Sequence, residues 1–214
     1  MRTHPKSEKF FTAEEKEKLK AATREVESRT IGEIAVMVVD HSDHYMEAEV
    51  LGSALAGSLL SLILTVLFFD SSLWFYIPLS FLFFFPCWFL LIKVAVLKKA
   101  FIGLRRKEDA VRLRAERAFF ERGLYRTKKN TGVLFFISIL ERKVWVLADK
   151  GIYKKMDQET LNRFAREVSG GIKEGRACDA LSRAIGEIGA HLAKHFPITP
   201  DDTNELSDDV MTEE

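Results

Sequence analysis

Two long apolar runs stand out in a chain whose polar and apolar positions otherwise follow helix or strand spacing. Residues 50–69 and 73–92 each hold twenty positions without a charged side chain, and only Asp70-Ser71-Ser72 separates them. About 20 apolar residues are enough for a helix to cross a bilayer, and soluble cores rarely sustain such runs. The pattern therefore predicts a two-helix transmembrane hairpin whose outer ends lie on one side of the membrane.

Outside the hairpin, the spacing of apolar residues predicts helices and buried strands. Thr12, with Glu15 three residues later, has the pattern of a capping box and predicts the start of a helix. Short apolar runs rich in β-branched residues are typical of strands buried on both faces, and they lie at residues 33–39, 133–139 and 144–148. Helical spacing continues at residues 105–126, 157–172 and 177–196.

This order of elements predicts an α/β fold, specifically an α/β/α sandwich with a small mixed sheet that a two-helix transmembrane hairpin interrupts. A strand, a crossover and a second strand favour a parallel pair, and the short turn that follows makes the third strand antiparallel. We expect residues 1–49 to form the first part of the domain and residues 98–196 the second, with the hairpin at 50–97. Residues 197–214 are predicted to be an acidic tail with little regular structure.

The distribution of basic residues predicts the orientation of the hairpin. The turn contains no Lys or Arg, whereas the second apolar run is followed by Lys93, Lys98, Lys99, Arg105, Arg106 and Lys107. The positive-inside rule then places both termini in the cytoplasm, with two spans in the cytoplasmic (inner) membrane. A net charge of +1 gives no global attraction to nucleic acid. The partners we expect are membrane lipids and either another membrane protein or a second copy of the chain.

Small residues recur along one face of the first apolar run. Ser53, Gly57 and Ser61 are four positions apart, a spacing that lets another helix approach closely. The approaching helix is either the second helix of the hairpin, which we favour, or a helix of another subunit.

The stretch D-H-S-D-H-Y-M-E-A-E at residues 40–49 is the first candidate for chemistry. Zinc accepts histidines such as His41 and His44, and calcium or magnesium accepts carboxylates such as those of Asp40 and Asp43. The favoured interpretation is a solvated connector between the sheet and the membrane, without a bound ion.

Asp149 is the second candidate, because it ends the third strand immediately before Lys150-Gly151. The strand hairpin should bring Asn130 beside it, which makes the two residues a candidate cation site. If the first two strands are parallel, Asp40 lies at the opposite end of the sheet. The alternative role for Asp149 is a turn or helix cap. The sequence contains no glycine-rich phosphate loop and no D-x-D motif, so no catalytic residue is assigned and enzymatic activity stays open.

Several segments resemble the TPM domain family, also labelled TPM phosphatase. They are F-T-A-E-E-K-E-K-L at 11–19, R-T-I-G-E-I-A-V-M-V at 29–38, N-T-G-V-L-F-F-I-S at 130–138 and E-R-K-V-W-V-L-A-D-K-G-I at 141–152. The closing H-F-P-I-T-P-D-D-T-N-E-L at 195–206 is similar to the tail of a bacterial membrane-linked branch. The resemblance implies an α/β/α sandwich, and it brings proposals of divalent cation binding through aspartates and of phosphatase activity. Many relatives place the domain outside the cytoplasm, whereas this chain carries a hairpin inside it.

Together these observations predict a membrane-anchored, TPM-like binding or assembly module that is accessory to a membrane complex. Calcium or magnesium is the candidate cofactor. The alternative is a metal-assisted phosphatase that uses Asp149 and Asp40.

Overall fold

The computed structural model divides the chain into two compact units. It describes residues 5–69, 72–127, 129–200 and 204–212, so the predicted turn residues Asp70 and Ser71 lie outside the described part. One unit, the hairpin unit, is Asp43–Lys107. The other, the sheet unit, combines Met1–Ser42 with Glu108–Glu214.

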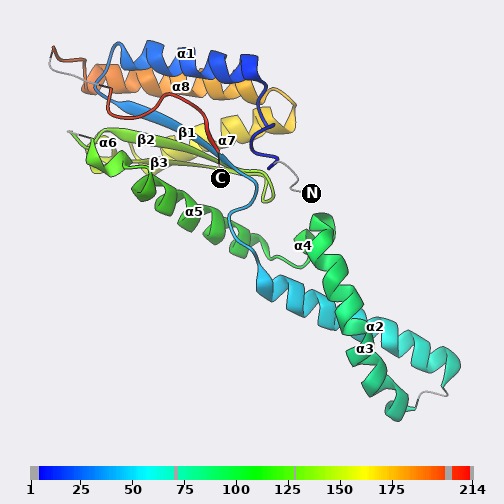
Figure 1. Cartoon of the computed structure of the whole chain (residues 1–214). Coiled ribbons are helices and arrows are strands. Elements are labelled where there is room, and N and C mark those ends of the chain that lie inside the picture. Colours follow the sequence, from blue (N-terminus) through cyan, green and yellow to red (C-terminus); the bar gives the residue numbers. More distant parts are fainter. Residues whose placement is uncertain (1–4, 70–71, 128, 201–203, 213–214) are drawn as a thin grey trace. The chain divides into compact units, whose positions relative to one another are not determined.

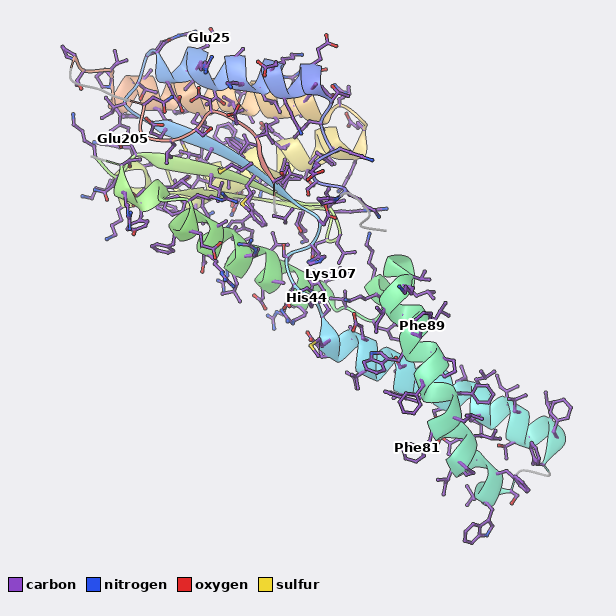
Figure 2. All side chains as sticks on the ribbon, viewed as in Figure 1. Glu25, His44, Phe81, Phe89, Lys107 and Glu205 are labelled. Atoms are coloured by element: carbon purple, nitrogen blue, oxygen red, sulfur yellow. The ribbon has the colours of Figure 1, made fainter. Side chains whose placement is uncertain are left out.

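The hairpin unit contains two long apolar helices that pack against each other (Figure 1). They are α2 (Met46–Phe68) and α3 (Leu73–Lys93), and the short α4 (Ala95–Ala100) follows. Both α2 and α3 are long and apolar enough to cross a membrane. Large apolar side chains such as Phe81 and Phe89, which are 70% and 65% exposed, point outward from α3 (Figure 2).

The small residues of α2 face α3 within the same hairpin. Ser53 and Ser61 are fully buried, and a Cβ atom built at Gly57 would lie 3.1 Å from the backbone nitrogen of Phe84. The prediction that this stripe serves packing inside the hairpin is therefore confirmed. The alternative, in which the same stripe contacts another subunit, is wrong because α3 already covers it.

A four-stranded mixed sheet forms the centre of the sheet unit, in the order β3-β2-β1-β4. Strand β1 (Glu33–Val39) pairs in parallel with β2 (Gly132–Ser138), and β2 pairs antiparallel with β3 (Lys143–Ala148). The parallel pair and the antiparallel third strand agree with the prediction. Because β1 and β2 are buried along their whole length, both faces of the sheet are covered.

The C-terminal segment adds a strand that the sequence did not predict. Strand β4 (Met211–Thr212) lies parallel to β1. Two ion pairs hold the residues before it against the first helix: Asp208 with Arg24 and Asp209 with Lys20, each at 2.7 Å. Long-range pairing, rather than any local strand pattern, explains why this segment is ordered.

Helices cover both faces of the sheet, as the sandwich prediction requires (Figure 1). One core cluster joins Val36 and Phe135 to residues such as Phe164 and Ile185. The other joins Met37 and neighbouring strand residues to the apolar face of α5. The capping box of Thr12 and Glu15 is present at the start of the first helix. The helices are α1 (Ala13–Glu27), α5 (Leu104–Glu121), the 3-10 turn η1 (Leu124–Arg126), α6 (Lys150–Tyr153), α7 (Gln158–Lys173) and α8 (Ala177–His195).

Candidate functional site

Asp149 lies where β3 ends and α6 begins, and only 6% of the residue is exposed. One carboxylate oxygen, Oδ1, accepts a hydrogen bond of 2.6 Å from the amide of Lys150 and caps α6. The other, Oδ2, is buried and has no hydrogen-bond partner among the described residues. Oδ1 therefore fits the cap role predicted for Asp149, and the cation role stays a prediction for Oδ2.

Asn130 lies beside Asp149, where the strand pairing places it. The amide of Gly151 donates a hydrogen bond of 3.0 Å to the Asn130 carbonyl, and Asn130 itself adopts a left-handed backbone with φ of 56°. A Cβ atom at Gly151 would come within 2.5 Å of that carbonyl oxygen. Glycine is therefore required at this position for the loop before β2 to approach α6.

A cavity of about 320 Å³ opens beside these two residues. Aromatic side chains form much of its wall, and Asn130 and Asp149 supply polar atoms to it. The sequence indicated those two residues, but it did not indicate the aromatic ones, because nothing in the spacing of α5 shows which of its apolar residues border a cavity. The aromatic residues are Phe119 and Phe120 of α5, Tyr125 of η1 and Tyr153 of α6.

The charged groups at this cavity give it a small excess of negative charge. Glu116 and Asp149 contribute carboxylates, and Lys150 contributes an ammonium group. Burial, and to a smaller degree the charge of Glu116, raise the pKa of Tyr153, while a hydrogen bond from the backbone at Ala148 opposes them. The phenol of Tyr153 donates to Gln158 Oε1 at 2.9 Å, so Tyr153 is a neutral donor near physiological pH.

Asp40 lies at the other end of the sheet. In the register of the sheet, Val39 pairs with Ser138, whereas Asp149 follows the residue that pairs with Val133. The carboxylate of Asp40 accepts hydrogen bonds from the amides of Lys6 at 3.0 Å and Ser7 at 2.6 Å. Burial alone would raise its pKa, but these hydrogen bonds outweigh burial and lower it. The structure thus separates Asp40 from Asp149 and uses Asp40 to hold the N-terminal segment.

The remaining candidates divide between the two units. His41 belongs to the sheet unit, and Asp43 and His44 belong to the hairpin unit. Burial tends to raise the pKa of Asp43, but ion pairing with Arg106 lowers it. The carbonyl of His44 accepts a hydrogen bond from the ammonium group of Lys98. Within the described residues no group of three or more His, Cys, Asp or Glu side chains is placed to hold a metal ion. A cation bound at Asp149 would therefore need amide, carbonyl or water oxygens as its other ligands, which calcium and magnesium accept.

A comparison with known protein families finds a match to one segment of the chain. Residues 92–191 match the TPM domain. This TPM match covers a little under half of the chain and includes β2, β3 and the whole cavity beside Asp149. Strand β1 lies outside the matched residues, although it pairs with β2 along its full length.

A solved structure supports the fold beyond the TPM match. The chain is similar to the NMR structure of the BA42 protein from the psychrophilic bacterium Bizionia argentinensis, with a TM-score of 0.60 and 20% identity. The alignment covers 95% of this chain and 96% of that chain. No curated protein matches the chain. At this identity the likeness establishes the mixed α/β fold, and the functional assignment depends on the site itself.

Proposed function

We propose that the protein is a membrane-anchored binding module, accessory to a membrane complex, whose cavity beside Asp149 binds calcium or magnesium. The main support for this proposal is Asp149 Oδ2, a buried carboxylate oxygen that has no hydrogen-bond partner among the described residues. A buried acceptor that is left unpaired is costly, so such an oxygen beside a cavity suits a ligand that supplies positive charge. Asn130 lines the same cavity, and its side chain carries a neutral amide oxygen.

The two apolar helices are the proposed anchor. Their length and composition support two membrane crossings, and the basic residues Lys93, Lys98 and Lys99 after the second one support a cytoplasmic location for both termini. Labelling of single cysteines in intact cells tests this orientation. The bacterial membrane-linked branch of the TPM family, with its hairpin inserted into the domain, is the assignment that this layout favours.

The composition of the cavity wall favours binding over catalysis. Its lining residues include no serine, threonine, cysteine or histidine within the described part of the chain. The pairing of a hydroxyl or thiol nucleophile with a histidine base is therefore missing there. Metal-assisted hydrolysis of a phosphate ester is the alternative function, and it would depend on the same Asp149.

Calorimetric titration of the detergent-purified protein with calcium and with magnesium tests the proposal. We expect saturable binding by the wild type and a loss of at least about tenfold in Asp149→Asn, because charge-assisted contacts are worth roughly twice neutral ones. Asparagine is also a good N-cap, so α6 should persist in the variant. Asp157→Asn is the matched control, since Asp157 caps α7 in the same way through Thr160.

Two outcomes contradict the proposal. Absence of saturable binding to the wild type removes the cation site, and equal losses in the two variants show that the effect is not local to the cavity. Hydrolysis of a generic phosphomonoester by the wild type, dependent on the cation and abolished in Asp149→Asn, would instead establish the phosphatase.

A further inference from the structure

A second cavity of about 530 Å³ lies at the end of the sheet opposite Asp149. Its wall combines the end of β2, the turn between β2 and β3, the last part of α7 and Phe10 of the N-terminal segment. None of the residues considered for cation binding lines it. Its chemistry differs from that of the first cavity, because its charged lining residues are all basic.

Two of these basic residues are exposed and form no ion pair with a described residue. They are Arg142 and Lys173, and both line the cavity. Lys143 also lines the cavity and pairs with Glu108. Two positive charges at the wall of one cavity are therefore left without an ion-pair partner among the described residues.

Glu141, the acidic residue next to Arg142 in the turn, does not line the cavity. Glu141 is 7% exposed, and its carboxylate accepts hydrogen bonds from the amide of Ser42 at 3.1 Å and from the hydroxyl of Ser138. The carboxylate is thereby committed to the turn, and it does not line the cavity. Ser169, at the wall beside Lys173, offers a hydroxyl group as a further donor.

The backbone at Arg142 points to the same conclusion. Arg142 adopts a left-handed conformation with φ of 54°, which residues other than glycine and asparagine rarely adopt. Glycine or asparagine would relieve the strain and still close the four-residue turn. The chain nevertheless places an arginine there, and Arg142 lines the cavity.

Four apolar side chains form a further part of the wall. Phe10, Ile137, Ile139 and Ile172 line the cavity together with the basic groups. An inorganic anion would satisfy the charges and leave this apolar surface without a contact. A purely apolar ligand would bury the cations without neutralising them, which is costly.

We propose that this cavity binds an anionic amphiphile, in which a phosphate or carboxylate group contacts Arg142 and Lys173 and an attached hydrocarbon chain contacts the isoleucines and Phe10. Such a group occurs in the head of an anionic membrane lipid and in a soluble amphiphile, and the chemistry of recognition is the same. The inference does not depend on the cation site, because the two cavities share no lining residue.

Titration of the full chain in phosphatidylcholine nanodiscs with hexyl phosphate tests the proposal by calorimetry, with empty nanodiscs as the blank. We expect saturable binding of hexyl phosphate, and binding at least about tenfold weaker for inorganic phosphate and for hexanol, since each lacks one half of the ligand. Addition of phosphatidylglycerol to the nanodisc distinguishes a membrane lipid from a soluble amphiphile. If phosphatidylglycerol weakens the binding of hexyl phosphate, the ligand is a lipid of the bilayer. If the affinity for hexyl phosphate is unchanged, the ligand is a soluble amphiphile.

The decisive variant is Arg142→Asn combined with Lys173→Gln, which should weaken hexyl phosphate binding at least about tenfold. Asparagine tolerates the left-handed backbone, so the turn should remain folded. The single variant Lys173→Gln, at the exposed end of α7, provides a second test that leaves the turn unchanged. The control is Arg183→Gln with Lys194→Gln, which removes the same charge from exposed positions of α8. Three results would overturn the proposal. The decisive variant could bind hexyl phosphate as tightly as the wild type, or the control could lose as much affinity as the decisive variant. Inorganic phosphate could also bind as tightly as hexyl phosphate, which would indicate an adventitious ion only.

Discussion

Glu27 is the side chain whose protonation differs most from that of a surface carboxylate. Its pKa is raised from 4.5 to about 8. Burial is the main cause, the carboxylates of Glu33 and Asp208 add to it, and the amide of Ile34 opposes it with a hydrogen bond of 3.0 Å. Arg24 pairs with Asp208 and not with Glu27. A proton on Glu27 therefore reduces the repulsion among the carboxyl groups of Glu27, Glu33 and Asp208, which lie close together near the end of α1.

The raised pKa predicts a stability that falls with pH. Between about pH 4.5 and pH 8 the folded chain retains a proton that the unfolded chain releases, so the free energy of unfolding decreases as the pH rises through this window. Glu27→Gln should remove this slope and stabilise the protein at pH 8.5 by roughly 1–3 kcal/mol, since one pKa unit corresponds to about 1.4 kcal/mol. Thermal unfolding at pH 5.5 and pH 8.5 measures the effect.

The matched control is Glu25→Gln, because Glu25 lies on the same helix (Figure 2), is exposed and forms an ion pair with Arg29. It should leave the pH slope unchanged. A Glu27→Gln variant that keeps the wild-type slope would show that Glu27 titrates normally.

At the scale of elements, the hairpin depends on the close approach of α2 and α3 at Gly57. A Cβ atom there would meet the backbone of Phe83 and Phe84 at 3.1–3.2 Å, so a leucine side chain has to push the helices apart. We expect Gly57→Leu to destabilise the hairpin by about 1–3 kcal/mol, the usual cost of overpacking. Thermal unfolding in detergent, combined with cross-linking of a cysteine pair placed across α2 and α3, measures the change.

Ala54→Leu is the control for this substitution, since Ala54 lies on α2 three residues earlier and is exposed. It should leave both the unfolding temperature and the cross-link unaffected. If Gly57→Leu behaves like Ala54→Leu, the helices do not pack along this stripe.

The sequence predicted those elements that their own residues determine. Strands β1, β2 and β3 and the Thr12 cap follow local patterns, and Asp149 follows from the position of a polar residue after a strand. Helix α2 begins at Met46, before the apolar run, because ion pairs of Glu47 with Arg106 and of Glu49 with Lys98 stabilise its first turn. Such partners are about fifty residues away in the chain, and no local pattern shows them.

The candidate cavities were less predictable for the same reason. Phe119 and Tyr125 border the Asp149 cavity because α5 and η1 fold back onto the end of β3, and apolar periodicity indicates only that such residues are buried somewhere. The basic groups of the second cavity come from a turn and from the end of a helix, which are ordinary places for solvated charges. Their meeting at one cavity is a property of the tertiary fold.

At the scale of the whole molecule, one sheet is built from strands on both sides of the hairpin. Strand β1 precedes the hairpin and β2 follows it, yet they pair over seven residues. A chain that crosses a bilayer between two paired strands has to return, so the sheet requires an even number of crossings. The two helices that are long and apolar enough to cross a membrane would satisfy this requirement, whereas a single crossing would separate β1 from β2.

This requirement leads to a labelling experiment in intact bacterial cells. With Cys87 and Cys178 replaced by alanine, we introduce a single cysteine at Ser72, before α3, or at Glu25, on α1. A membrane-impermeant maleimide added outside, after permeabilisation of any outer membrane, should label Ser72→Cys, because the positive-inside rule places the turn outside the cytoplasm. It should label Glu25→Cys only after the cells are lysed. Labelling of both positions in intact cells, or of neither, would contradict two crossings, because the sheet unit and the turn would then lie on the same side of the membrane.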